Sequence, residues 1–380
     1  MKKVLFLLFA AIVFFKIVQA QDTPSNLWQK SPEFTIGANV VHPLDLSITE
    51  QNTILSNINA AGVRVIRIGF FAADTAKGIA FIQRAYAQHI KVLLIVHSQY
   101  ALNAPIRAYQ PKEFPGMWQG QPLSYADVKL SAAYFRQLLG KLDADGISLA
   151  GLELENEINH PGFNAEFPLP GEGRNFGLND LYHDVEGQQI AKGYLQYLKV
   201  LTVLKQLRDH SKLNQYTPLI SAGLSDTGPE GPWPTPKKYD AVSISATIRF
   251  LRANGLDSLV DAYGIHVYPW ADSPGDKVAA VHRLRRLMQT ALPECYPSDS
   301  QIGKPCWITE WGFTNDSTSC PSNEQARSLL VQEMMNDFRQ LAKEGRLTGL
   351  LYYSWTGDRV WDVYRCGALT QTGKIALQPF

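Results

Sequence analysis

Two glutamates at the ends of apolar stretches are the residues best placed to do chemistry. Glu157 closes the segment LELENE (152–157), and Glu310 closes the segment WITE (307–310). A lone glutamate at a strand end is more often a solvated turn residue, because charged side chains prefer the surface. Two of them at one opening could cleave a glycosidic bond, which requires one protonated carboxyl group and one ionised carboxylate. Their surroundings must then hold their pKa values apart.

The elements that would position these glutamates alternate along the chain as strand and helix. Apolar, β-branched runs predict eight strands, over residues 35–41, 63–70, 91–97, 149–156, 218–224, 262–267, 306–310 and 349–354. Helical periodicity predicts helices over 79–88, 125–142, 194–209, 277–290 and 324–343. Gly62, Gly146 and Gly345 each follow a helical run, where a helix C-cap favours glycine. The alternation is typical of an α/β protein with a parallel sheet.

Eight strands of this kind favour a (β/α)8 TIM barrel formed as a single domain by residues 35–380. Long segments follow three predicted strands, and in such a barrel the loops after the strands build the active site. A doubly wound open sheet is the alternative. It is disfavoured because NVVHP (39–43), and not a glycine-rich phosphate-binding turn, follows the first strand. In a barrel, Glu157 and Glu310 would end strands four and seven and face each other across the mouth.

The first twenty residues have the pattern of a secretory signal peptide. A basic start leads into an apolar run that stops at Lys16, and VQA (18–20) places small residues before an expected cleavage at Gln21. The alternative, an N-terminal membrane anchor, would need roughly 20 apolar residues. We expect residues 21–34 to form a lead-in segment and the mature protein to be secreted or periplasmic, with no membrane contact.

The charge balance excludes several classes of partner. The chain has 36 lysines and arginines against 35 aspartates and glutamates, a net charge of +1. A surface so close to neutral argues against nucleic-acid binding and against a polybasic membrane-binding face. We expect a monomer with no cofactor and no bound metal, whose partner is a glycan.

The four cysteines can form disulfide bonds in an exported chain. Their spacing does not match a zinc ribbon, and four cysteines allow three pairings. In the expected barrel, Cys295 and Cys306 flank the connection at the bottom that enters strand seven, whereas Cys320 and Cys366 follow strands seven and eight at the top. The other pairings would cross between faces, beyond the ~7 Å Cα separation that a disulfide tolerates. We therefore predict Cys295–Cys306 and Cys320–Cys366.

The whole expected barrel resembles the clan A glycoside hydrolases, the (β/α)8 retaining enzymes that include family 5 cellulases and mannanases and family 39 xylosidases. That clan has an Asn-Glu pair at the end of strand four and a glutamate at the end of strand seven. The resemblance implies that Glu157 is the acid/base, that Glu310 is the nucleophile, and that Asn156 binds the substrate. The clan's familiar Asn-Glu-Pro is Asn-Glu-Ile here, which leaves the family and the substrate open.

Further residues match the pattern of this clan. Arg67 on strand two stands where family 5 members have an arginine near the nucleophile, and it would keep Glu310 ionised. The segment GIHVY (264–268) matches the clan's His-x-Tyr. The resemblance implies that Tyr268 hydrogen-bonds the nucleophile and that His266 orients the acid/base or the substrate.

Strand four carries two more carboxylates, Glu153 and Glu155. Glu153 resembles the buried glutamate of the family 5 motif and would pair with an arginine, because an unpaired buried carboxylate is costly. Glu155 shares the parity of Glu153 and Glu157, so the strand must twist or bulge near its end. We assign Glu155 no catalytic role.

Aromatic side chains and one histidine complete the expected binding site. Trp355, at the end of strand eight, matches the aromatic floor of the clan's −1 sugar site. His97 ends strand three and is an expected substrate contact, although a histidine there is structural about as often. Packing within loops is the alternative for the tryptophans that could act as sugar platforms, which are Trp118, Trp233, Trp270, Trp311 and Trp361. We include Trp311 in the expected binding site.

The expected function is that of a secreted retaining β-glycoside hydrolase, which cleaves a β-linked polysaccharide or oligosaccharide by double displacement. Several loop tryptophans favour an elongated cleft and endo action of the β-glucanase kind, whereas loops that wall off a pocket would give exo action of the xylosidase or mannosidase kind. A non-catalytic carbohydrate-binding barrel is a second alternative. The third is a metal-dependent barrel enzyme, with ligands drawn from His42, His97, His160 and His266.

Overall fold

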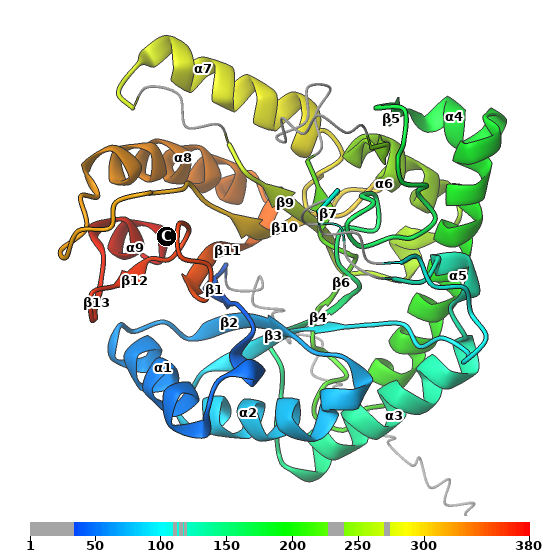
Figure 1. Ribbon diagram of the computed structural model, residues 1–380, viewed down its shortest axis with the longest axis horizontal. Coiled ribbons are helices and arrows are strands. Elements are labelled where there is room, and N and C mark those ends of the chain that lie inside the picture. Colours follow the sequence, from blue (N-terminus) through cyan, green and yellow to red (C-terminus); the bar gives the residue numbers. More distant parts are fainter. Residues whose placement is uncertain (1–33, 109–111, 114–116, 118–119, 227–238, 270–273) are drawn as a thin grey trace, which may run out of the picture. The chain divides into compact units, whose positions relative to one another are not determined.

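Parallel strands form a curled sheet, and helices pack along its outside (Figure 1). The structure is a computed structural model that describes residues 34–108, 112–113, 117, 120–226, 239–269 and 274–380. Phe34–Phe380 forms one compact unit. The predicted signal peptide, and all of the lead-in except Phe34, lie outside the described residues.

Nine strands of the described residues make up the sheet, in the order β6-β4-β3-β2-β1-β11-β10-β9-β7. Every neighbouring pair in it is parallel. The strands are β1 Thr35–Val40, β2 Val65–Gly69, β3 Lys91–Val96, β4 Gly151–Leu154, β6 Leu219–Ile220, β7 Leu224–Ser225, β9 Tyr263–Val267, β10 Cys306–Trp311 and β11 Leu347–Thr356. All eight predicted strands are therefore present, and the fifth is split into β6 and β7.

Two backbone bridges connect the ends of this sheet. Ile220 at the end of β6 bridges Ala262, the residue before β9, and Asn156 beyond β4 bridges Gly223, the residue before β7. Since β4 already pairs with β6, and β7 with β9, the split strand lies between β4 and β9. The strands thus follow one another as in the expected barrel, with their carboxyl ends at one edge.

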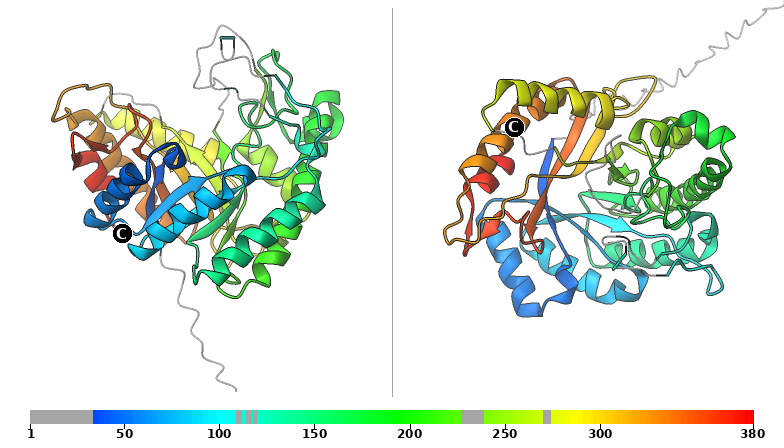
Figure 2. Two further views of the ribbon diagram at one scale, coloured as in Figure 1. Left: turned by 60° about the horizontal axis from the view of Figure 1, so that its bottom comes forward. Right: turned by 45° about the horizontal axis from the view of Figure 1, so that its top comes forward.

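Helices follow one another along the outside of the sheet, and Figure 2 gives the same arrangement from two further sides. They are α1 Ile48–Ala60, α2 Thr75–Ala87, α3 Val128–Ala144, α4 Leu178–His183, α5 Val185–Asp209, α6 Ile244–Ala253, α7 Lys277–Arg286, α8 Gln325–Lys343 and α9 Gln371–Ala376. The five predicted helices correspond to α2, α3, α5, α7 and α8. Gly62, Gly146 and Gly345 have φ of 79°, 74° and 70° just after α1, α3 and α8, which confirms their role as caps.

The inward-facing side chains of the strands form two layers. The lower layer is a small apolar cluster, separate from the main core between sheet and helices, and it contains Leu93, Ile220, Ala262, Trp307 and Leu351 with Val65 packed against it. Two residues further along three of these strands stand Arg67, Thr309 and Tyr353, because alternate side chains point to the same face. This apolar cluster thus lies beneath a polar layer at the carboxyl ends of the strands.

Both predicted disulfide bonds are present. Cys295 and Cys306 have a Cα separation of 5.4 Å, and Cys320 and Cys366 have one of 5.6 Å. The first bond closes the connection into β10, and the second joins the loop after β10 to the hairpin after β11. Among the helices of the described residues, none has the length and apolar character to cross a membrane.

Candidate active site

Arg67 on β2 is the centre of the polar layer, and its side chain is 2% exposed. Its Nε donates to Glu153 Oε2 at 2.6 Å, and its Nη1 donates to Glu310 Oε1 at 2.6 Å. The same guanidinium donates to Asn39 Oδ1 at 3.0 Å and to Asn156 Oδ1 at 2.8 Å. Because a buried cation is stable only when paired and hydrogen-bonded, these contacts hold side chains from β1, β2, β10 and the β4 region in one arrangement.

Glu153 has the structural role expected from the sequence. Its side chain is fully buried, and besides Arg67 it accepts a hydrogen bond from Thr309 Oγ1 at 3.0 Å. Asn39 adds a further link, because its Nδ2 donates to the backbone oxygen of Thr309 at 2.9 Å. Both carboxylate oxygens of Glu153 are thus engaged on the inner face of the curled sheet.

Glu310 on β10 is a carboxylate held between donors. Arg67 donates to Oε1, and the hydroxyl of Tyr268 donates to Oε2. His266 Nδ1 lies 3.5 Å from the same Oε2. Burial alone would raise the pKa of Glu310, but His266, Arg67 and the hydrogen bonds from Tyr268 and Arg67 hold it below its usual value. The side chain is therefore ionised at neutral pH.

The carboxylates of Glu157 and Glu310 both approach the buried ring of His266. Its Oε1 lies 2.7 Å from His266 Nδ1, and its side chain is 12% exposed. One carboxylate oxygen of Glu157, one of Glu310 and a ring nitrogen of His266 all lie within 4.8 Å of one another. The carboxyl groups of retaining glycosidases are about 5–5.5 Å apart, and those of inverting ones ~6.5–9.5 Å apart. The closest oxygens of the two carboxylates thus approach one another as a pair that could act on one sugar requires.

Gly223, in the break between β6 and β7, makes room for this arrangement. A Cβ atom at this position would lie 2.1 Å from His266 Nε2 and 2.7 Å from Glu153 Oε1. Its backbone oxygen accepts from the amide of Glu157 at 2.8 Å. The sequence analysis missed this residue, although an isolated glycine inside a predicted strand is a signal of close backbone approach.

The end of β4 departs from regular strand geometry, as its parity predicted. Glu155 and Glu157 have φ of 64° and 41°, the left-handed region that non-glycine residues seldom adopt. Asn159, which follows the Asn-Glu-Ile segment, is fully buried. Its Nδ2 donates to the backbone oxygens of Ser225 at 2.9 Å and Val242 at 2.8 Å. This amide joins the loop after β4 to β7 and β8 (Ala241–Val242).

Two aromatic side chains pack around Tyr268, whose hydroxyl donates to Glu310. The ring of Trp361 lies edge-on to Tyr268 at 4.9 Å, and Tyr353 lies edge-on to Tyr268 at 5.9 Å. Both Trp361 and Tyr353 are partly exposed. Burial and the charge of Glu310 raise the pKa of Tyr268 well above its usual value, so the hydroxyl keeps its proton and continues to donate. We call Tyr268, Tyr353 and Trp361 the aromatic wall.

Two tryptophans expected in the binding site are instead part of the core. Trp355 is 0% exposed and stacks on Tyr364 with ring centroids 5.2 Å apart. Trp311 is 0% exposed and packs edge-on against Phe338 of α8 and Tyr352. The register of β10 and β11 is irregular just before these residues, and such a bulge re-aims the side chains that follow it. The expectation of substrate contact is therefore wrong for both.

The other tryptophan candidates divide between the wall and the undescribed residues. Trp361 belongs to the aromatic wall. Trp118, Trp233 and Trp270 lie outside the described residues. Tyr353 is the aromatic residue of β11 beside Glu310, and no sequence signal distinguished it from its neighbour Trp355.

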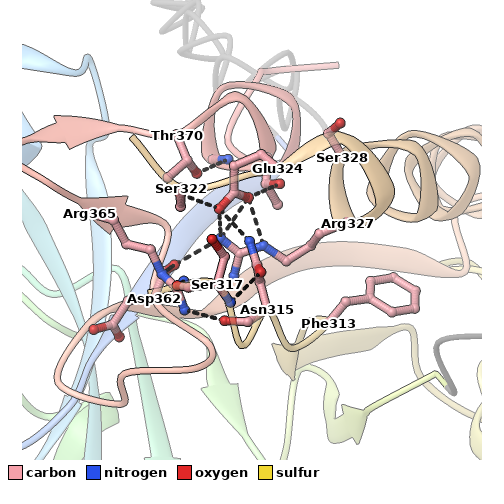
Figure 3. A network of polar contacts seen from close by, with 12 residues as sticks. Phe313, Asn315, Ser317, Ser322, Glu324, Arg327, Ser328, Asp362, Arg365 and Thr370 are labelled. Atoms are coloured by element: carbon pink, nitrogen blue, oxygen red, sulfur yellow. Dashed lines mark hydrogen bonds and ion pairs between the residues drawn. The ribbon is translucent and has the colours of Figure 1, made fainter. Parts of the chain in front are cut away.

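Glu324 and Arg327 form a buried ion pair at the centre of a network of polar contacts (Figure 3). Glu324 accepts two hydrogen bonds from Arg327, both at 2.8 Å, and one from Asn315 Nδ2 at 2.8 Å. Arg327 also donates to the backbone oxygens of Trp361 at 3.2 Å and Asp362 at 3.0 Å. This network fixes the loop after β11 against α8, close to the Cys320–Cys366 bond.

His97 lies at the end of β3, beside Glu155 rather than beside the catalytic candidates. Its Nδ1 is 3.0 Å from Glu155 Oε2, and Glu155 Oε1 accepts from the amide of Ser98 at 2.6 Å. The carboxylate of Glu155 thus orients the imidazole. The side chain of His97 is 18% exposed, so the imidazole remains accessible to a ligand.

The cluster of Glu157, His266 and Glu310 also has the composition of a metal site. Its chemistry fits a metal ion poorly. Both oxygens of Glu310 already accept hydrogen bonds, from Arg67 and from Tyr268. The guanidinium 2.6 Å from Glu310 would repel a divalent cation at the same carboxylate.

No protein-family model matches the chain, and no curated protein matches it either. Among solved structures, a report on two fungal β-1,4-galactanases describes one that is 15% identical, with a TM-score of 0.53, covering 90% of this chain and 98% of that one. A GH5-4 broad-specificity endoglucanase from an uncultured bacterium is 15% identical, with a TM-score of 0.53, covering 91% of this chain and 93% of that one.

A third similar structure is a GH5_18 protein from Bifidobacterium longum in complex with Manβ1-4GlcNAc. It is 11% identical, with a TM-score of 0.53, and covers 90% of this chain and 77% of that one. At such low identity these matches establish a common fold. The resemblance noted in the sequence is thereby confirmed at the level of the fold, which the chain shares with these solved structures.

Proposed function

We propose that this protein is a secreted retaining β-glycoside hydrolase with Glu157 as acid/base and Glu310 as nucleophile. The observation that carries the proposal is the pair of carboxylates whose oxygens approach within 4.8 Å, in different surroundings. Glu310 faces an arginine, a tyrosine hydroxyl and a histidine. Glu157 contacts only His266 among these groups. Retaining hydrolysis needs this division of roles.

In the first step, the ionised carboxylate of Glu310 attacks the anomeric carbon of the bound sugar. The bond from that carbon to the glycosidic oxygen breaks, and the proton of Glu157 passes to the leaving oxygen. Arg67 and Tyr268 hold the attacking carboxylate in place, which reduces the reorganisation needed during the reaction. The product of this step is a glycosyl ester on Glu310.

In the second step, the carboxylate of Glu157 accepts a proton from a water molecule that attacks the same carbon. The ester bond breaks, and Glu310 regains its charge beside Arg67. Asn156 contributes in both steps: its Oδ1 accepts from Arg67, so its amide hydrogens are directed away from the guanidinium. They can donate to the sugar 2-hydroxyl, a contact that strengthens in the transition state.

For the domain organisation, the location and the oligomeric state of the protein, we keep the predictions made from the sequence. We propose residues 35–380 as one catalytic domain, residues 1–20 as a cleaved signal peptide, and a secreted or periplasmic monomer. Two disulfide bonds support an oxidising compartment. The substrate is a β-glycan or oligosaccharide, and we propose endo action of the β-glucanase kind, with the aromatic wall next to the cleaved bond.

Reducing-sugar release from β-glucans, mannans, xylans and galactans tests the proposal. Wild-type protein should act on at least one of them, and NMR should show that the first product keeps the β configuration. Glu310→Gln and Glu157→Gln should each lose activity on the natural glycan by at least about 10³-fold, whereas Glu344→Gln, an exposed glutamate in the turn after α8, should not. Both active-site variants at wild-type rates, or binding without any product, would refute hydrolysis by this pair.

A further inference from the structure

Tyr239 carries a buried polar atom that the proposed reaction steps do not use. It stands two residues before β8 and is half-buried. Its phenol oxygen is inaccessible to solvent and has no hydrogen-bond partner in the part of the chain that the structure describes. Buried polar groups are nearly always hydrogen-bonded in native proteins, so an exception requires an explanation, and a part in catalysis is one of these.

The neighbours of Tyr239 place its ring against the turn that carries Glu157. The next residue, Asp240, is fully buried, and its carboxylate accepts from the backbone amide of Glu172 at 3.0 Å, outside this turn. The Tyr239 ring instead packs edge-on against the imidazole of His160, with ring centroids 5.1 Å apart. The backbone amide of His160 donates to the backbone oxygen of Glu157 at 2.9 Å. Tyr239 and Glu157 are therefore neighbours through the same turn.

The charge of Glu157 acts on the hydroxyl of Tyr239. Burial and this charge raise the pKa of Tyr239 to about 12, so the hydroxyl keeps its proton at neutral pH and is a hydrogen-bond donor. His160 brings no competing charge, because burial and Arg107 hold its pKa below the usual value although Glu157 raises it. Its Nδ1 accepts from the amide of Gly162 at 3.0 Å, so this nitrogen carries no proton. A neutral donor thus stands next to a carboxyl group that changes its charge during the proposed reaction.

We propose that Tyr239 is a positioning residue for the acid/base, whose hydroxyl donates to the carboxylate of Glu157 once that group has given its proton to the glycosidic oxygen. The inference rests on the proposed function and deepens it. His266 Nδ1 already lies 2.7 Å from Glu157 Oε1, so the tyrosine serves the other oxygen, Oε2. Catalytic hydrogen bonds are often open without substrate and close in the complex. A carboxylate accepts up to about four hydrogen bonds, so room remains for the attacking water.

Deleting the hydroxyl should change the pH at which the acid/base loses its proton. A hydrogen bond to the ionised form lowers the pKa of a carboxyl group, so Tyr239→Phe should raise the pKa of Glu157 by about one unit. The first step needs the protonated form of Glu157, and kcat/KM falls as the pH rises through its pKa. The basic limb of the kcat/KM profile should therefore move to higher pH by the same amount. The other ionisable groups next to Glu157, which are His266 and Glu310, are unchanged in this variant.

A second buried tyrosine provides the matched control. Tyr134 lies on α3 and is 7% exposed, and Tyr134→Phe should keep the wild-type basic limb. Tyr239→Phe retains the ring against His160 and deletes an atom without a partner, so the thermal midpoint of unfolding should not fall. Equal basic limbs in wild-type and Tyr239→Phe protein, or equal shifts in the two variants, would overturn the inference.

A measurement without substrate separates this inference from the proposed hydrolysis. NMR of protein that carries an isotope label at the glutamate carboxyl carbons gives the pKa of Glu157, whose resonance is the one missing from Glu157→Gln. Tyr239→Phe should raise this pKa by about one unit, and Tyr134→Phe should leave it unchanged. An unchanged value in Tyr239→Phe would overturn the positioning role. The expected shift, in a protein that releases sugar from no glycan, would support the contact and overturn only the proposed hydrolysis.

Discussion

Removing the hydroxyl of Tyr268 should shift the acid limb of the pH–activity profile. Tyr268→Phe keeps the ring that packs on Trp361 but deletes the hydrogen bond to Glu310. That bond is one of the causes that hold the pKa of Glu310 below its usual value. A hydrogen bond to a charged group contributes roughly 1.5–3 kcal/mol, and one pKa unit corresponds to 1.36 kcal/mol. The pKa of Glu310 should therefore rise by about one to two units.

The sign follows from the role of the ionised form. Glu310 attacks as a carboxylate, so kcat/KM falls as the pH drops through its pKa, and a raised pKa moves this fall to higher pH. The assay is kcat/KM against pH for the free enzyme. Tyr353→Phe is the control, since its hydroxyl donates to Asp358 at 3.2 Å and not to Glu310. An unshifted acid limb in Tyr268→Phe, or equal shifts in both variants, would refute the reasoning.

Two further substitutions test the polar layer. Arg67→Met leaves two buried carboxylates without their cation, so it should lower the free energy of unfolding, measured by urea titration, by about 3–5 kcal/mol. The control Arg64→Met, at an exposed position, should change it by less than ~0.5 kcal/mol. Equal stability of the two variants would contradict the ion-pair account. Gly223→Ala places a Cβ atom against His266 and should reduce kcat/KM about 10²-fold. The control Gly140→Ala, at a position in α3 with open space around it, should leave kcat/KM unchanged. A fully active Gly223→Ala protein would show that the position of His266 is unimportant.

The sequence predicted the strands and the polar centre because both depend on local pattern. Apolar β-branched runs indicated every strand of the nine-stranded sheet, and the polar residues Arg67, Glu157, His266 and Glu310 stand at or near the carboxyl ends of such runs. Parallel strands bring those ends to one edge of the sheet, so distant segments converge without further information. The predictions left out α1 and α6, although these helices are as long as the predicted helices α2 and α7, with 13 and 10 residues respectively.

The predictions for Trp311 and Trp355 failed because local strand irregularities are invisible in the sequence. Along β10, the partners Ile308↔Ile265 are followed by Glu310↔His266, so one residue of β10 is unmatched. Such a bulge re-aims side chains, and it allows Glu310 to face the mouth while Trp311 packs on α8. A similar shift on β11 separates Tyr353 from Trp355.

The most direct test of the central claim is to trap the covalent intermediate. Wild-type protein is incubated with a 2-deoxy-2-fluoro-β-glycoside of the sugar that it releases, and the digested protein is analysed by mass spectrometry. We predict a glycosyl ester on the peptide that contains Glu310, formed in wild-type protein and absent from Glu310→Gln. A label on another residue, or turnover with inversion and no label, would contradict the assignment of Glu157 and Glu310.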